Sequence, residues 1–130
     1  MSRPTILCVD DDPLVLASLT GQLRGAFGSA YALETARSAE DALEVIEDLV
    51  AEGIRLLVIV SDWLMPGVRG DELLVRVHAR HPEVVKVLLT GQADDASVER
   101  ARREGGLAAC LHKPWEEADL VAVIRESLRP

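Results

Sequence analysis

Short apolar runs recur along the chain, and between them lie longer segments with apolar residues at every third or fourth position. Four runs are rich in residues that favour strands, and a weaker fifth lies at residues 31–36. The run at 56–60 shows no alternation of apolar and polar positions, which is typical of a strand covered on both faces. The four stronger runs are TILCV (5–9), LLVIV (56–60), VVKVLL (84–89) and AACL (108–111).

The segment after each run has the spacing of an amphipathic helix. Some ends also carry capping signals: Asp12 and Ser38 can cap the first and second helices, and Gly105-Gly106 stops the fourth. The helices are expected from Pro13 to Phe27, from Ser38 to Val50, between the Pro66-Gly67 turn and His81-Pro82, at 96–104, and from Trp115 to Leu128.

This alternation of strand and helix, repeated five times, predicts a doubly wound α/β fold. Parallel strands joined by crossover helices form a five-stranded sheet between two helical layers, which is a three-layer sandwich. Neither a linker nor a low-complexity stretch interrupts the pattern. Residues 1–130 are therefore expected to form a single domain, either whole or cut from a longer protein with a C-terminal output domain.

Composition narrows the expected partners and compartment. The chain has 22 acidic and 14 basic residues, giving a net charge of −8, and it contains no basic stripe. Direct nucleic-acid binding is therefore not expected. Its apolar runs are too short to cross a membrane, no signal peptide opens the chain, and Cys8 and Cys110 belong to no C-x-x-C pair. These features indicate a cytoplasmic protein without zinc.

Polar residues capable of chemistry follow four of the predicted strands. Three aspartates at 10–12 follow the first, Asp62 the third, Thr90 the fourth and Lys113 the fifth. The carboxyl ends of parallel strands meet at one edge of a sheet, so these groups are expected to converge. Clustered carboxylates repel each other unless a cation is present, and oxygen ligands at an open site suit Mg²⁺. A carboxylate can also attack phosphorus, with an ammonium and a hydroxyl stabilising the transferred group.

Four motifs in this order resemble those of the receiver domains of two-component response regulators. They are ILCVDDDP, VSDWLMPGVRG, LLTG and LHKPW, and the resemblance extends from Ile6 to Leu128. It implies a flavodoxin-like sheet with strand order 2-1-3-4-5. It also implies a phosphoacceptor switch rather than an enzyme, because such domains catalyse only their own phosphorylation and dephosphorylation.

The partners implied by the resemblance are a histidine kinase or phosphotransfer protein and an output domain. Either the output domain or a second copy of the chain is expected to dock on the face made by the fourth helix, the last strand and the last helix.

The resemblance also implies a role for each acidic residue of the site. Asp62 would accept the phosphoryl group. Asp10, Asp11 and the backbone carbonyl of Leu64 would join Asp62 in holding Mg²⁺. Asp11 would bind the metal directly and Asp10 largely through water.

The expected switch residues follow the family pattern only in part. Thr90 and Lys113 would each contact a phosphoryl oxygen, and Lys113-Pro114 resembles the cis peptide of the family. An aromatic residue usually stands where this chain has Cys110, and its ring moves inward when the threonine moves. A thiol is smaller, so the signal is expected to leave through the loop after Thr90 and the fourth helix.

Two other functions fit parts of the same pattern. Phosphohydrolases of the haloacid-dehalogenase type also use a strand-end aspartate, Mg²⁺, a Thr or Ser and a Lys. However, Pro13-Leu14 stands where that family has Gly and Thr, and no later acidic pair completes its metal site. A pseudo-receiver that only binds a partner is the third possibility, although here every catalytic position is filled.

Overall fold

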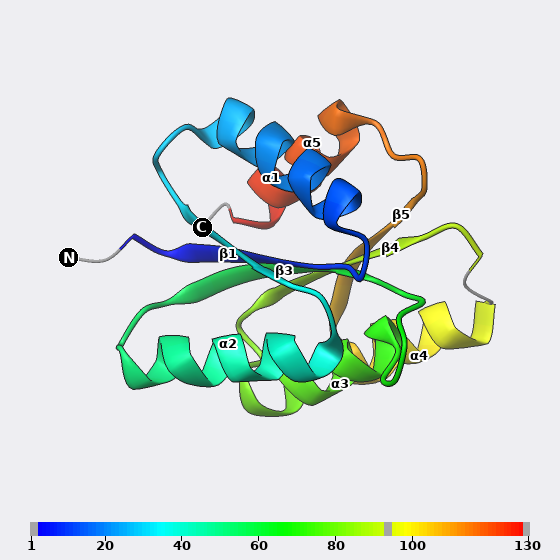
Figure 1. The fold of residues 1–130 in the computed structure, drawn as a ribbon. Helices are drawn as coiled ribbons and strands as arrows, with labels where there is room; N and C mark the ends of the chain where they lie inside the picture. Colours follow the sequence, from blue (N-terminus) through cyan, green and yellow to red (C-terminus); the bar gives the residue numbers. More distant parts are fainter. Residues whose placement is uncertain (1–2, 93–94, 129–130) are drawn as a thin grey trace.

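The computed structural model describes residues 3–92 and 95–128, in which five parallel strands form one sheet between two helical layers (Figure 1). The strand order is β2-β1-β3-β4-β5, which confirms the predicted doubly wound, flavodoxin-like sandwich. Each predicted strand is present to within two residues at either end. The strands are β1 (Thr5–Val9), β2 (Ala32–Ala36), β3 (Leu56–Asp62), β4 (Val85–Thr90) and β5 (Leu107–His112).

One face of the sheet is covered by α1 and α5 and the other by α2, α3 and α4 (Figure 1). Both predicted N-caps are confirmed, since the side chain of Asp12 accepts a hydrogen bond from the Leu14 amide and that of Ser38 from the Asp41 amide. The helices are α1 (Pro13–Phe27), α2 (Ala39–Ala51), α3 (Gly70–Arg80), α4 (Asp95–Gly105) and α5 (Glu117–Ser127). No helix in the described part of the chain is long and apolar enough to cross a bilayer.

The predicted start of the last helix at Trp115 was wrong, because α5 begins at Glu117. Trp115 instead lies in the β5–α5 loop, where its indole nitrogen donates a 2.7 Å hydrogen bond to Oε1 of Gln22. Its ring packs against the core beneath α1 and α5. The apolar character of Trp115 therefore reflects packing between the loop and α1, and not a turn of helix.

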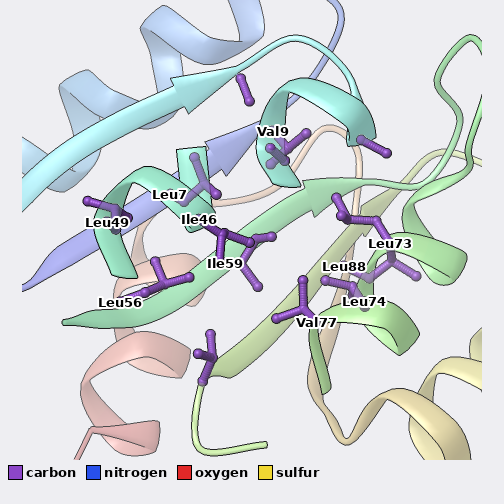
Figure 2. Packing of buried hydrophobic residues seen from close by; sticks show 14 of the residues in the cluster. Leu7, Val9, Ile46, Leu49, Leu56, Ile59, Leu73, Leu74, Val77 and Leu88 are labelled. Carbon is purple, nitrogen blue, oxygen red and sulfur yellow. The ribbon is translucent and has the colours of Figure 1, made fainter. Parts of the chain in front are cut away.

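The burial of β3 on both faces explains why its sequence shows no alternation of apolar and polar positions. Ile59 belongs to the apolar cluster between the sheet and α2, α3 and α4 (Figure 2). Val58 and Val60 belong to the cluster on the opposite face, under α1 and α5. Each fully buried side chain of this size contributes roughly 1.5–3 kcal/mol of transfer free energy. The strand is therefore held firmly from both sides, and so is the residue at its end, Asp62.

The start of α3 is packed directly against the end of β3. The amide of Gly70 donates a 2.7 Å hydrogen bond to the carbonyl of Trp63. A Cβ atom at position 70 would overlap the backbone carbonyl of Asp62, so only glycine fits there. This close approach helps to fix the backbone on which Asp62 is carried.

Candidate functional site

Three carboxylates meet at the carboxyl edge of the sheet. Asp10 and Asp11 follow β1, and Asp62 is the last residue of the neighbouring strand β3. One ligand oxygen from each lies within 4.8 Å of the others. Asp10 and Asp62 are buried and Asp11 is exposed, so the cluster opens to solvent on one side.

The ammonium of Lys113 closes the cluster from the side of β5. Its Nζ donates a 2.9 Å hydrogen bond to Oδ2 of Asp10 and lies 3.0 Å from Oδ1 of Asp62. The Lys113 amide donates to the carbonyl of Thr90 at 2.9 Å, which holds the backbone beside the end of β4. The Lys113-Pro114 peptide bond is cis, as expected from the sequence.

The electrostatics of the cluster favour a further cation. Burial raises the pKa of the Asp62 carboxyl, and the charges of Asp10 and Asp11 add to this shift, although Lys113 opposes it. Burial disfavours the ammonium of Lys113, but its hydrogen bonds to Asp10 and Asp62 raise its pKa overall. The three carboxylates carry more negative charge than Lys113 offsets. A hard, oxygen-binding ion such as Mg²⁺ fits this donor set.

Backbone contacts fix the loop that presents the two N-terminal acids. Oδ1 of Asp10 accepts a 2.9 Å hydrogen bond from the Asp12 amide. The guanidinium of Arg37, which follows β2, donates to the backbone carbonyl of Asp11 at 3.0 Å. Sequence reasoning did not single out Arg37, and a basic residue just after β2 was the available signal for this anchoring contact.

Thr90 and Leu64 are the remaining predicted site residues, and their side chains differ in burial. Thr90 is buried at the end of β4, and its hydroxyl oxygen accepts a 3.0 Å hydrogen bond from the amide of Gln92. The side chain of Leu64 is 60% exposed, beside the buried Met65 that anchors the same loop in the core. Lys113 therefore contacts the carboxylates directly, Thr90 lies at the end of the next strand, and the Leu64 side chain points to solvent.

The two cysteines differ in their surroundings. Cys8 is fully buried, and burial raises the pKa of its thiol to about 12. Cys110 is only half-buried on β5, where it packs against the apolar cluster beneath α3 and α4. Both thiols are free.

A network of charges beside the site was missed from the sequence. Arg69, in the loop between β3 and α3, pairs with the fully buried Asp71 at 3.2 Å. Its guanidinium also lies 5.7 Å from the centre of the Trp63 ring. Arg100 of α4 approaches Asp71 at 3.8 Å and donates to Glu72 at 2.8 Å. The network therefore joins the loop after Asp62 to α4.

A model of the response regulator receiver domain matches residues 6–125. The chain belongs to this family. The predicted family and phosphoacceptor receiver function are thereby confirmed, and the haloacid-dehalogenase alternative is set aside. A receiver domain is a signalling domain, in line with the expectation of a switch.

Two similar regulators are longer than this chain, which matches only a part of each. It is 32% identical over 127 residues to the C4-dicarboxylate transport transcriptional regulatory protein DctD of Pseudomonas aeruginosa, covering 98% of this chain and 26% of DctD. It is 32% identical over 122 residues to the transcriptional regulatory protein FixJ of Azorhizobium caulinodans, covering 92% of this chain and 53% of FixJ. The chain thus spans about a quarter to a half of these regulators.

A solved CheY-like response regulator receiver domain from Methanospirillum hungatei JF-1 superimposes with a TM-score of 0.85. The two chains are 30% identical, and the match covers 98% of this chain and 94% of the other. The similarity therefore extends over the whole fold, including all the strand ends that form the carboxylate cluster.

Proposed function

We propose that Asp62 is the phosphoacceptor of this receiver domain and that Asp10, Asp11 and the Leu64 carbonyl join it in holding Mg²⁺. The observation that supports this most is the position of Asp62. It is buried at the end of the central strand, 3.0 Å from the Lys113 ammonium and within 4.8 Å of oxygens of Asp10 and Asp11. A fixed carboxylate beside a cation site is what attack on phosphorus requires.

In the proposed transfer, a carboxylate oxygen of Asp62 forms a bond to phosphorus while the bond from phosphorus to the leaving group breaks. The leaving group keeps the electron pair. Bound Mg²⁺ would neutralise negative charge on the carboxylates and the phosphoryl oxygens. Lys113 would pair with one phosphoryl oxygen, and the Thr90 hydroxyl would bond another.

We propose that the signal then leaves through the loop after β4. In the resting structure the Thr90 hydroxyl accepts from the Gln92 amide, so turning it toward a phosphoryl group changes this contact. The loop leads into α4, whose buried residues are only Ser97, Ala101 and Gly105. The α4–β5–α5 face is the proposed surface for an output domain or a homodimer. The Cys110 side chain would pack within this face and would not transmit the signal.

The proposed donor is a histidine kinase or a phosphotransfer protein in the cytoplasm. Residues 1–130 would act as one receiver domain controlling an output domain or a separate partner. The named transcriptional regulators among the relatives are longer than this chain, which supports control of an output region. Apart from its own phosphorylation and dephosphorylation, the domain would catalyse no reaction.

Incubation with acetyl phosphate and Mg²⁺ tests this proposal. Trp63 adjoins Asp62, so its fluorescence should change to a plateau as each molecule takes up one phosphoryl group. The change should be absent when EDTA removes Mg²⁺. Sustained release of phosphate from a range of phosphate esters, without a plateau, would show a phosphohydrolase instead.

A further inference from the structure

A second concave surface lies between α2 and α3, which we call the α2–α3 groove. It has a volume of about 680 Å³, and the buried side chains of Ile46 and Val77 form its floor. Leu43 and Val50 line the α2 wall, and the Val50 side chain is 59% exposed. An exposed apolar groove of this kind offers a place where another apolar surface can pack.

The two walls of the α2–α3 groove carry opposite charges. Every charged residue of α2 is acidic, whereas Arg76 and Arg80 line the α3 wall. Glu47 projects from the α2 wall into the same groove. Arg76 is paired with Glu72, but neither Glu47 nor Arg80 has an ion-pair partner within residues 3–92 and 95–128. Two unpaired charges of opposite sign therefore flank an apolar floor.

The position of the groove restricts what can occupy it. Its lining comes from residues 43–51 of α2 and 76–81 around the end of α3. Both helices run antiparallel to the strands, so these residues lie toward the sheet edge opposite Asp62 (Figure 1). Contact in the groove is therefore made away from the carboxylate cluster. An occupant of the groove would also leave Asp62 accessible.

We propose that the α2–α3 groove is an interface with a second copy of this chain. A two-fold axis at the groove would place the acidic α2 wall of each copy against the basic α3 wall of the other. Apolar surface then meets apolar surface, and the contact between Glu47 of one copy and Arg80 of the other occurs twice. The unpaired Glu47 of each copy would meet the unpaired Arg80 of the other, which is the complementarity that an isologous contact requires.

The expected association is weak and independent of phosphorylation. With 13 residues, α2 is about 20 Å long, so two such helix pairs make an interface at the small end of specific contacts. Burial of Val50 and its neighbours supplies affinity, and the charged rim sets the orientation. The interface is distinct from the α4–β5–α5 face of the proposed function, so either surface can be disproved without the other.

Sedimentation velocity at rising protein concentration, without phosphodonor, tests the interface. The wild type is expected to form dimers, and Val50→Asp is expected to remain monomeric with an unchanged melting temperature. Glu47→Arg and Arg80→Glu should each lose dimerisation, since like charges then face each other twice. An equimolar mixture of these two variants should form a heterodimer, because both contacts become attractive again.

Asp48→Arg is the matched control, because it makes the same charge change on α2 but lies outside the groove lining. It should dimerise like the wild type. The proposal fails if the wild type stays monomeric at all concentrations. It also fails if Glu47→Arg dimerises normally or if the mixed variants remain monomeric.

Discussion

The ammonium nitrogen of Lys113 lies 3.0 Å from Oδ1 of Asp62, at the point where β5 reaches the carboxylates of β1 and β3. The same nitrogen donates to Asp10 at 2.9 Å. Lys113 therefore offsets part of the repulsion among the acids at rest. It is also placed to follow negative charge when a phosphoryl group is added to Asp62.

Replacing Asp62 by a neutral residue should stabilise the unphosphorylated domain against unfolding. In EDTA at neutral pH, we expect Asp62→Asn to raise the free energy of unfolding by roughly 1 kcal/mol, the usual scale of single substitutions. The reason is that Asp62 is buried beside other carboxylates. Urea unfolding measures the difference. Asp71→Asn is the contrasting control and should destabilise, because Asp71 is buried against Arg69.

The stability gained in Asp62→Asn should depend on pH. Burial raises the pKa of the Asp62 carboxyl, so the folded protein holds this proton more tightly than the unfolded chain. The contribution of this group to stability is therefore largest at low pH and falls as pH rises through the folded pKa. The gap between variant and wild type should narrow as the pH falls from the folded pKa to the unfolded pKa. A gap of constant size would contradict the burial argument.

Removal of Asp11 should weaken Mg²⁺ binding. We expect Asp11→Ala to lower the affinity by roughly 10–100-fold, a range found even for residues that only orient metal ligands. Titration followed by Trp63 fluorescence measures it. Asp12→Ala is the control: its side chain caps α1, so it should cost about 1 kcal/mol of stability yet leave Mg²⁺ affinity unchanged. Equal titration curves for Asp11→Ala and wild type would remove Asp11 from the ligand set.

Loss of the Lys113 ammonium should abolish the conformational switch and leave Mg²⁺ binding intact. Lys113→Ala should bind Mg²⁺ at least as tightly as the wild type, because a positive charge has left the site. Its amide NMR spectrum should not respond to beryllofluoride, which stands in for the phosphoryl group. Lys113→Arg keeps the charge with a different shape and serves as the comparison. A folded Lys113→Ala protein without Mg²⁺ binding would disprove this role.

The half-buried Cys110 should be dispensable for the switch. In Cys110→Ala, beryllofluoride is expected to shift the amide signals of Thr90–Gln92 and α4 as in the wild type. The thiol only packs against the apolar cluster beneath α4, so its removal should cost stability but no response. Retained fold and Mg²⁺ binding with no shifts would instead make Cys110 the lever of the switch.

The fold and the carboxylate cluster were predictable for a shared reason. Uninterrupted apolar runs such as 56–60 identify buried parallel strands, and the topology then forces the residues after them to one edge. Asp10, Asp62 and Lys113 are brought together in this way although they are distant in sequence. The run could not show that β3 continues to Asp62. That extension depends on its pairing with β4, where Asp62 lies opposite Leu89.

Contacts that depend on how helices meet could not be predicted. Lys86 lies within an apolar strand run and is fully buried, with its ammonium 2.7 Å from Nδ1 of His78 and 3.1 Å from the carbonyl of Pro82. Burial lowers the pKa of Lys86. His78, at the other end of this hydrogen bond, is half-buried on α3. Likewise, nothing along α3 reveals that Asp71 would be buried between Arg69 and Arg100.

Locating the phosphoryl group on the chain tests the central claim most directly. Sodium borohydride reduces an acyl phosphate to an alcohol, so an aspartyl phosphate becomes homoserine and is identified by peptide mass spectrometry. After treatment with acetyl phosphate and Mg²⁺, the account predicts homoserine at position 62, and no labelling of Asp62→Asn. Homoserine at position 10, 11 or 12, or equal labelling of Asp62→Asn, would contradict it.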